Sequence, residues 1–298
     1  MTDQPNASNP TKPSSLGRAF QQIGSLTAIS RIVGFMRDIA FASFLGAGPA
    51  ADAFLVALKL PNMFRRLSAE GAMTNALLPS FAKIRETDGR DAALRLASEA
   101  QIFLIIVLFA IVVLAEIFMP EVIALLAPGF TATPDRLAAA VDLARVTMPY
   151  LPMISVVALW GAIANAHDRF MAAAAAPILA NLCFISGAIS IPILAADLGM
   201  FKALPIAIGL LVAGFCQLLF LFFVLRRLSA VPKLQWPRLS NAGKHMWRKF
   251  LPAALGAGGM QLNLLVDLIL ASMLPVGAIS WLYYADRVAQ LPLGIVGI

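Results

Sequence analysis

Residues 102–119 read IFLIIVLFAIVVLAEIFM, a run in which Glu116 is the one charged side chain. About 20 apolar residues are enough for an α-helix to cross the roughly 30 Å hydrocarbon core of a bilayer. The whole chain has this character: 60% of its 298 residues are hydrophobic, 13% are charged, and the mean hydropathy is +0.82. Too little polar surface remains to coat a soluble globule of this length. The sequence therefore predicts an all-α polytopic membrane protein.

Eight segments are predicted as spanning helices on the criterion of length and apolar content. They are residues 22–45, 51–82, 99–119, 138–165, 170–196, 201–225, 249–274 and 278–298. Pro61 interrupts the second segment and is expected to kink it, because proline removes a backbone donor. The eighth segment stops within an apolar run at Ile298, which predicts that the chain is an N-terminal fragment of a longer transporter.

The basic residues in the connections predict the orientation, because Lys and Arg are retained on the cytoplasmic side. Fourteen of the 23 Lys and Arg residues precede helix 1 or follow helices 2, 4 and 6, whereas the opposite connections hold only Arg136 and Lys202. The N-terminus and the loops 83–98 and 226–248 are therefore predicted to be cytoplasmic, and the turns 46–50 and 275–277 periplasmic. Residues 1–20, rich in Ser, Pro, Asn and Thr, are predicted to be a disordered tail without a cleaved signal peptide.

Several function classes fit the sequence poorly. The net charge of +7 does not indicate nucleic-acid binding, because the basic residues are dispersed between apolar runs. Cys183 and Cys216 lie inside apolar segments and are expected to be small buried hydrophobes. His167 and His245 are too far apart to form a ligand cluster, so neither a metal nor a cofactor is predicted. No HxxxD motif suggests a membrane enzyme.

Charged residues inside the predicted spans are the informative ones, since each is costly in lipid and normally faces a wet cavity or a partner. In helix 1, Arg31, Gly34 and Asp38 share a face, with Arg37 beside it. With a rise of about 1.5 Å per residue, Arg37 and Arg287 both lie roughly 12 to 14 Å from the outer end of their helices. We expect both near mid-membrane, with Asp38, Asp267 and Asp286 as partial counter-charges. Asp286 and Arg287 are neighbours on one helix and are not expected to face each other.

Two interpretations of these charges remain open. They can be interhelical ion pairs that hold the bundle together, or they can bind an anionic substrate. Cations outnumber acids in helices 1 and 2, which hold Arg31, Arg37, Lys59, Arg65 and Arg66 against Asp38, Asp52 and Glu70. This surplus favours an anion, and the planar fork of arginine suits phosphate oxygens. For Arg65 and Arg66, snorkelling to the interface is an equal alternative.

Helix 7 repeats part of helix 1. Residues 38–45 (DIAFASFL) and 267–274 (DLILASML) share Asp, Ala, Ser and Leu at the same spacing, and each copy is followed by a short turn and a helix with Leu-Pro. Both helices are predicted to run outward, so the repeat is parallel. A substrate site is then expected between the two copies.

The same segments carry a resemblance to the MurJ (MviN) family of lipid II flippases. They are SRIVGFMRD at 30–38, GAG at 46–48, ADAF at 51–54, KLPNMFRR at 59–66, AEGA at 69–72, APGF at 127–130 and SWLYYADR at 280–287. The chain resembles the family in all seven segments. Where family members often have a glutamate three residues after the helix 8 arginine, this chain has Gln290.

This resemblance implies a two-lobe, V-shaped exporter fold of the multidrug/oligosaccharidyl-lipid/polysaccharide type, of which the chain would hold about eight of an expected fourteen helices. The N-lobe would be 21–228, a cytoplasmic linker 229–248, and the start of the C-lobe 249–298. The family flips undecaprenyl-pyrophosphoryl disaccharide-pentapeptide across the bacterial inner membrane, driven by an ion or the membrane potential, and a monomer is expected. The resemblance implies cavity residues at Arg31, Arg37, Asp38, Asp52, Asn62, Arg65, Ser280 and Arg287. With the counter-charge Asp286, these are the predicted substrate-binding residues. A related lipid-linked oligosaccharide flippase or a multidrug exporter is the alternative.

Overall fold

The computed structural model describes residues 15–65, 73–234, 236 and 240–296, and every regular element in these ranges is helical. Four of these helical stretches are long and apolar enough to cross a membrane: Arg90–Ile117, Pro134–Ala166, Phe170–Ile189 and Gly199–Arg227. They coincide with the third to sixth predicted spans. The all-α membrane class is therefore confirmed, while the count of eight spans stays a prediction.

The first span comprises α1 (Ser15–Ala40) and η1 (Phe41–Leu45), a π-helical turn. Because α1 begins at Ser15, the prediction of a disordered tail is wrong for residues 15–20, and residues 1–14 lie outside the described residues. A helix that has already nucleated gains one hydrogen bond for each residue added, so α1 extends beyond its apolar part. Gly46 ends η1 with φ of 74°, a conformation that favours glycine.

The second predicted span is two helices, α2 (Pro49–Arg65) and α3 (Met73–Thr87). The predicted break at Pro61 is inside α2, which continues to Arg65, and residues 66–72 lie outside the described residues. Helix α4 (Arg90–Ile117) follows α3 after a connection of two residues, so most of the predicted loop 83–98 is helical. The loop prediction was wrong because charged residues mark where a helix leaves the apolar layer, and a helix can continue into water beyond that point.

Short helices follow α4 at the predicted periplasmic end. They are α5 (Met119–Leu126) and η3 (Pro128–Ala132). The fourth predicted span divides into α6 (Pro134–Thr147) and α7 (Tyr150–Ala166). Pro149 lies at this division, where its missing N–H and its ring oppose an uninterrupted helix.

The next two long helices, α8 (Phe170–Ile189) and α10 (Leu204–Arg227), are joined through α9 (Ile191–Leu194) and η4 (Gly199–Phe201). They pack closely at two glycines. A Cβ on Gly187 would lie 2.6 Å from the Pro205 carbonyl oxygen, and one on Gly209 would lie 2.8 Å from that of Cys183. Only the absence of a side chain at these positions permits this backbone approach.

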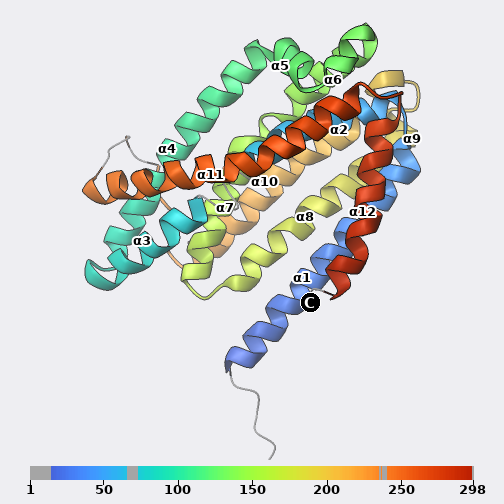
Figure 1. Ribbon diagram of the computed structural model, residues 1–298. Helices are drawn as coiled ribbons and strands as arrows, with labels where there is room; N and C mark the ends of the chain where they lie inside the picture. The colour runs from blue at the N-terminus through green and yellow to red at the C-terminus, as the bar shows by residue number, and fades with distance from the viewer. Residues whose placement is uncertain (1–14, 66–72, 235, 237–239, 297–298) are drawn as a thin grey trace, which may run out of the picture.

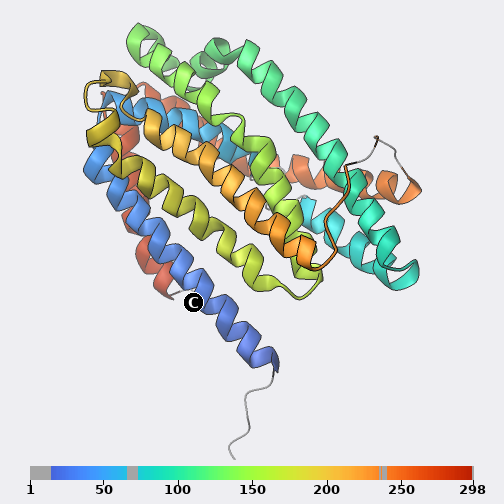
Figure 2. The same ribbon diagram turned by 180° about the vertical axis from the view of Figure 1, so that it is seen from behind.

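The last two helices are α11 (Asn241–Ser272) and α12 (Ala278–Val296). Helix α11 begins eight residues before its predicted start, because the Ser240 hydroxyl accepts a hydrogen bond from Gly243 N at 3.0 Å and caps the helix. Figure 1 shows α11 crossing the bundle and α12 running back beside α1, with α3 at the far end of α11. Figure 2 shows α1, α8 and α10 as successive long helices on the opposite face.

Helix α2 lies in the centre of the bundle and packs against α6, α7 and α12. Its residues 50–58 are all buried, and Ala53, Phe54, Val56 and Ala57 have no measurable exposure. The one charged residue in this stretch, Asp52, is also fully buried and therefore requires partners within the protein.

Candidate functional site

The polar part of α1 is centred on Arg37 and Asp38, immediately before the π-helical turn η1. The Arg37 guanidinium donates to Asp38 Oδ1 from Nε at 3.0 Å and from Nη2 at 2.8 Å. Adjacent helix residues diverge in direction, but the long arginine side chain folds back far enough to meet its neighbour. Asp38 is 7% exposed, so its charge depends on such contacts.

Helix α12 brings two more side chains to the same carboxylate. The Tyr283 hydroxyl donates to Asp38 Oδ1 at 2.9 Å, and Arg287 Nε lies 3.6 Å from Asp38 Oδ2. The Arg287 guanidinium also lies over the Tyr283 ring, 5.0 Å from its centroid. Arg37 and Arg287 thus both contact Asp38, whereas their depth near mid-membrane stays a prediction.

Helix α8 completes the surroundings of Arg37. Arg37 Nη1 donates to Asn181 Oδ1 at 3.0 Å, and the guanidinium lies 5.8 Å from the Phe41 ring centroid and 5.7 Å from that of Phe184. The two rings are 5.7 Å apart and nearly perpendicular. Hydrogen bonds and aromatic contacts therefore fix Arg37 in one orientation.

We call Arg37, Asp38, Tyr283 and Arg287 the arginine cluster. Two guanidiniums share one carboxylate, so the cluster carries a net charge of +1. Arg37 donates hydrogen bonds from Nε, Nη1 and Nη2, whereas Arg287 donates from Nη1 to Gln290 Oε1 at 3.3 Å. The Arg287 side chain is 34% exposed against 20% for Arg37. Arg287 is therefore the better placed of the two to bind an added anion.

Asp286 does not face Arg287 directly. Gln290 Nε2 donates to Asp286 Oδ2 at 2.6 Å, while Gln290 Oε1 accepts from Arg287. A neutral amide both donates and accepts, so Gln290 bridges an acid and a base that are sequence neighbours. Asp267, the third predicted counter-charge, is exposed on α11. No hydrogen bond or ion pair joins it to the arginine cluster within the described ranges, although α11 and α12 are in contact.

A second polar cluster joins α2, α6 and the start of α12. Arg136 Nη2 lies 2.5 Å from Asp52 Oδ2, and their side chains are 5% and 0% exposed. Asp52 also accepts hydrogen bonds from Gly277 N at 2.7 Å, Ser280 N at 2.8 Å and Ser280 Oγ at 2.5 Å. It thereby satisfies free N–H groups at the N-terminus of α12 and balances the positive end of the helix dipole.

The placement of Arg136 corrects the sequence analysis, which assigned it to an outer connection. Arg136 is in the first turn of α6, 4% exposed, and its guanidinium stacks 3.9 Å from the Phe130 ring centroid. A count of basic residues in connections cannot detect that one of them folds inward. Asp52 and Ser280, both predicted to bind substrate, are bonded to each other here, and we leave them out of the binding set proposed below.

Further contacts join η3 and η1 to the same end of α11 and α12. Gly129 N donates to Ser272 Oγ at 3.2 Å, and a Cβ on Gly129 would lie 1.9 Å from the Ser272 carbonyl oxygen. The Tyr284 hydroxyl donates to the Gly46 carbonyl oxygen at 2.9 Å. With the Asp52 cluster, these contacts close the predicted periplasmic end between the first six predicted spans and the last two.

The other predicted site residues are more dispersed. Arg31 is exposed on α1, about two turns before Asp38, and Asn62 is half-buried on α2. Arg65 is the last residue of α2, and its side chain lies outside the described part of the chain. The acids of the repeat also differ: Asp38 is buried and Asp267 exposed, although Gly46 and Gly277 adopt positive φ at matching turns.

Sequence reasoning missed Asn181, Tyr283 and Arg136 as partners of the charged residues. Tyr283 could have been found, because it lies four residues before Arg287 and therefore on the same helix face. Asn181 could have been found too, because a polar residue inside an apolar membrane helix usually faces the interior of the bundle and indicates a functional site. Within the described ranges, no group of three or more His, Cys, Asp and Glu side chains could hold a metal ion.

The family model described as "Lipid II flippase MurJ" matches residues 41–298 of this chain. The chain belongs to this family. A relative from Rhizobium meliloti, described as "Probable lipid II flippase MurJ", is 38% identical over 285 residues, 95% of this chain and 53% of its own length. "Lipid II flippase MurJ" from Burkholderia cenocepacia is 31% identical over 287 residues, 95% of this chain and 55% of that protein. This MurJ-family chain thus spans about half the length of these curated relatives.

Solved structures support the fold. A "Lipid II flippase MurJ, inward closed conformation" matches with a TM-score of 0.72 at 24% identity, covering 91% of this chain and 55% of that one. A MATE structure in complex with MaD3S matches with a TM-score of 0.69 at 17% identity, covering 93% and 62%. At these identities the likeness concerns the fold alone. The expected exporter architecture and the MurJ resemblance are both confirmed.

Proposed function

We propose that the full-length protein flips lipid II, the undecaprenyl-pyrophosphoryl disaccharide-pentapeptide, from the cytoplasmic to the periplasmic leaflet of the bacterial inner membrane. Its N-terminus is cytoplasmic in this proposal, and it acts as a transporter rather than an enzyme. Family membership supports the substrate, and the composition supports the membrane location. The arginine cluster is the observation that carries the mechanism.

The arginine cluster suits a pyrophosphate group for three reasons. It carries a net positive charge, it lies between helices from the two ends of the chain, and Arg287 retains exposed donors. Arginine binds phosphate oxygens through paired N–H donors, which a lysine ammonium cannot reproduce. Arg37 is held by Asp38 and Asn181, so it offers a fixed charge, and Arg287 offers the open hydrogen-bonding edge. Asp286 and Gln290 lie beside that edge, and Arg31, Asn62 and Arg65 remain proposed contacts farther along the path.

Alternating access requires the two ends of the path to open in turn. In the proposed cycle the contacts of Asp52, Gly129 and Tyr284 are made while the predicted periplasmic end is closed, and they separate when the lipid leaves. A bound pyrophosphate favours one state only through different affinities for the two. We propose that it does so by placing one anion between Arg37 and Arg287, which otherwise share a single carboxylate. An ion gradient or the membrane potential drives the cycle, and we assign no residue to that coupling.

The test is complementation of a flippase-depleted strain by full-length variants. Arg37→Ala and Arg287→Ala are expected to lose at least tenfold in flipping rate at normal membrane levels, since each removes a charge-assisted contact worth about 1.5–3 kcal/mol. The lysine variants are expected to recover only in part. Arg145→Ala is the matched control, because Arg145 forms an exposed pair with Asp142 at 3.7 Å. Full activity of both cluster variants would refute phosphate binding by these arginines.

A multidrug exporter is the alternative suggested by the likeness to MATE structures. The cationic surplus of the arginine cluster opposes it, because an exporter of cations needs a carboxylate-dominated site. Direct binding distinguishes the two: the purified full-length protein should bind a pyrophosphate-bearing polyprenyl lipid more tightly than its uncharged polyprenol, and Arg287→Ala should remove the difference.

A further inference from the structure

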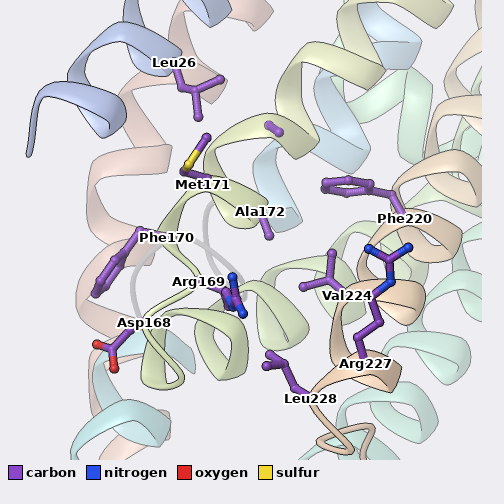
Figure 3. A pocket seen from close by; sticks show the side chains of 11 residues that line it. Leu26, Asp168, Arg169, Phe170, Met171, Ala172, Phe220, Val224, Arg227 and Leu228 are labelled. Atoms are coloured by element: carbon purple, nitrogen blue, oxygen red, sulfur yellow. The ribbon is translucent and has the colours of Figure 1, made fainter. Parts of the chain in front are cut away.

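A groove of about 570 Å³ lies on the outer side of the bundle, between α1, the α7–α8 connection, α8 and α10. Figure 3 shows the side chains of its wall, among them Leu26, Met171, Phe220 and Val224, and the guanidinium groups of Arg169 and Arg227. Arg169 directly precedes α8 and Arg227 ends α10, so both arginines lie at the end of the bundle predicted to be cytoplasmic. The groove is separate from the arginine cluster and plays no part in the proposed function.

The two groove arginines are available for an external anion. Both are exposed, and neither forms a side-chain hydrogen bond or ion pair with any residue in the described part of the chain. Asp168 is the acid of the lining, and Figure 3 shows its carboxylate directed away from Arg169 and Arg227. The charged side chains of the groove lining, Asp168, Arg169 and Arg227, therefore sum to a net charge of +1.

The rest of the groove lining is apolar, and α10 also exposes apolar side chains outside the groove. On α10, Phe215, Leu219 and Phe223 are 61%, 57% and 51% exposed and recur every four residues along one side of the helix. Exposed rows of large apolar side chains on a membrane helix face acyl chains. A ligand of this groove thus meets cations at the membrane boundary and hydrocarbon-like walls beside them.

We propose that this groove binds an anionic phospholipid of the cytoplasmic leaflet, with the phosphate between Arg169 and Arg227 and one acyl chain along α8 and α10. Charge complementarity selects the anionic headgroup, because each arginine near an anionic surface strengthens binding. The apolar wall selects a lipid over free phosphate, since inorganic phosphate gains nothing from Met171, Phe220 or Val224.

Native mass spectrometry of the full-length protein in detergent tests this. Dioleoylphosphatidylglycerol should bind more tightly than dioleoylphosphatidylcholine. Arg169→Gln and Arg227→Gln should each lower the affinity for the anionic lipid by about fivefold, and the double variant should lower it by about thirtyfold. The affinity for the zwitterionic lipid should not change. Ala175→Phe, which fills the groove without changing its charge, should lower the affinity for both lipids.

Arg226→Gln is the matched control, because Arg226 is exposed in the same helical turn but does not line the groove. It should retain the affinity of the wild-type protein. An equal loss in Arg226→Gln would show only general surface charge and would overturn the site, as would an unchanged lipid preference in the double variant. Displacement of the lipid by inorganic phosphate at the same concentration would show a plain anion site and would also overturn the proposal. The thermal stability of each variant is measured as well, and affinities are compared only among variants whose stability equals that of the wild-type protein.

Discussion

Replacing Arg136 by methionine is expected to destabilise the protein far more than the same change at Arg145. Both arginines are in α6 and both pair with an aspartate, so the chain provides its own comparison. The pair of Arg136 with Asp52 has a separation of 2.5 Å and side chains 5% and 0% exposed. The pair of Arg145 with Asp142 has a separation of 3.7 Å and side chains 44% and 54% exposed.

The magnitude follows from what Asp52 retains. Removing one partner of a buried ion pair costs about 3–5 kcal/mol, because the other charge is left without compensation. Asp52 would keep its three hydrogen bonds from Gly277 and Ser280, and methionine can replace the guanidinium over the Phe130 ring. The lower end, about 3 kcal/mol, is therefore expected, a factor of roughly 150 in the unfolding equilibrium. An exposed pair contributes at most about 1 kcal/mol, which bounds Arg145→Met.

The assay is equilibrium unfolding of the full-length protein in detergent, with a double-mutant cycle that adds Asp52→Asn. Each single change at the buried pair should cost about 3 kcal/mol, and the double variant should cost at least about 2 kcal/mol less than the sum, because the two residues act on each other. Equal stability of Arg136→Met and Arg145→Met would refute the reasoning. So would additive effects of the Arg136 and Asp52 changes, because the pair would then not be coupled.

Two more predictions concern the predicted periplasmic end and the orientation. Gly129→Ala should destabilise the protein by about 1–3 kcal/mol, because the added Cβ would meet the Ser272 backbone, which no rotamer change can relieve. Gly48→Ala is the control and should not destabilise it, because nothing lies within 4 Å of a Cβ at that position. Equal thermal stability of the two variants would contradict this packing. In a cysteine-free full-length background, an impermeant thiol reagent added to intact cells should label a cysteine at Ala47 and spare one at Asp88. The reverse pattern would overturn the proposed orientation.

Local composition was enough to predict the class and most of the helix placement. The apolar runs predicted the four stretches that are long enough to cross a membrane, and the predicted turn at 275–277 falls between helices in the structure. Of the predicted turn at 46–50 only residues 46–48 do so, because α2 begins at Pro49. Hydropathy failed at helix ends, as at α3 and α4, because it detects the apolar layer and not the backbone hydrogen bonds. The seven resembling segments also predicted the family correctly.

The arginine cluster was predicted in part, for a geometric reason. A constant helical rise places Arg37 and Arg287 at the same distance from the ends of their helices, and the sequence supplies both numbers. That estimate gives a position along each helix but no direction around its axis. It could therefore predict neither the contact of Arg37 with Asn181 of α8 nor the absence of Asp267 from the arginine cluster.

The sequence by itself determined that this chain is a bundle of membrane helices with an excess of arginine in its first two segments, because apolar content and charge are local properties. Only the tertiary structure decided what each charge does. Asp38 and Asp52 are both acids in apolar helices near glycine turns. Asp38 contacts two arginines in a partly exposed cluster, whereas Asp52 caps the N-terminus of α12 and pairs with Arg136. Their partners lie more than 80 residues away along the chain for Asp52 and more than 240 for the α12 contacts of Asp38. Contacts at such separations depend on how whole helices pack, which no local pattern specifies.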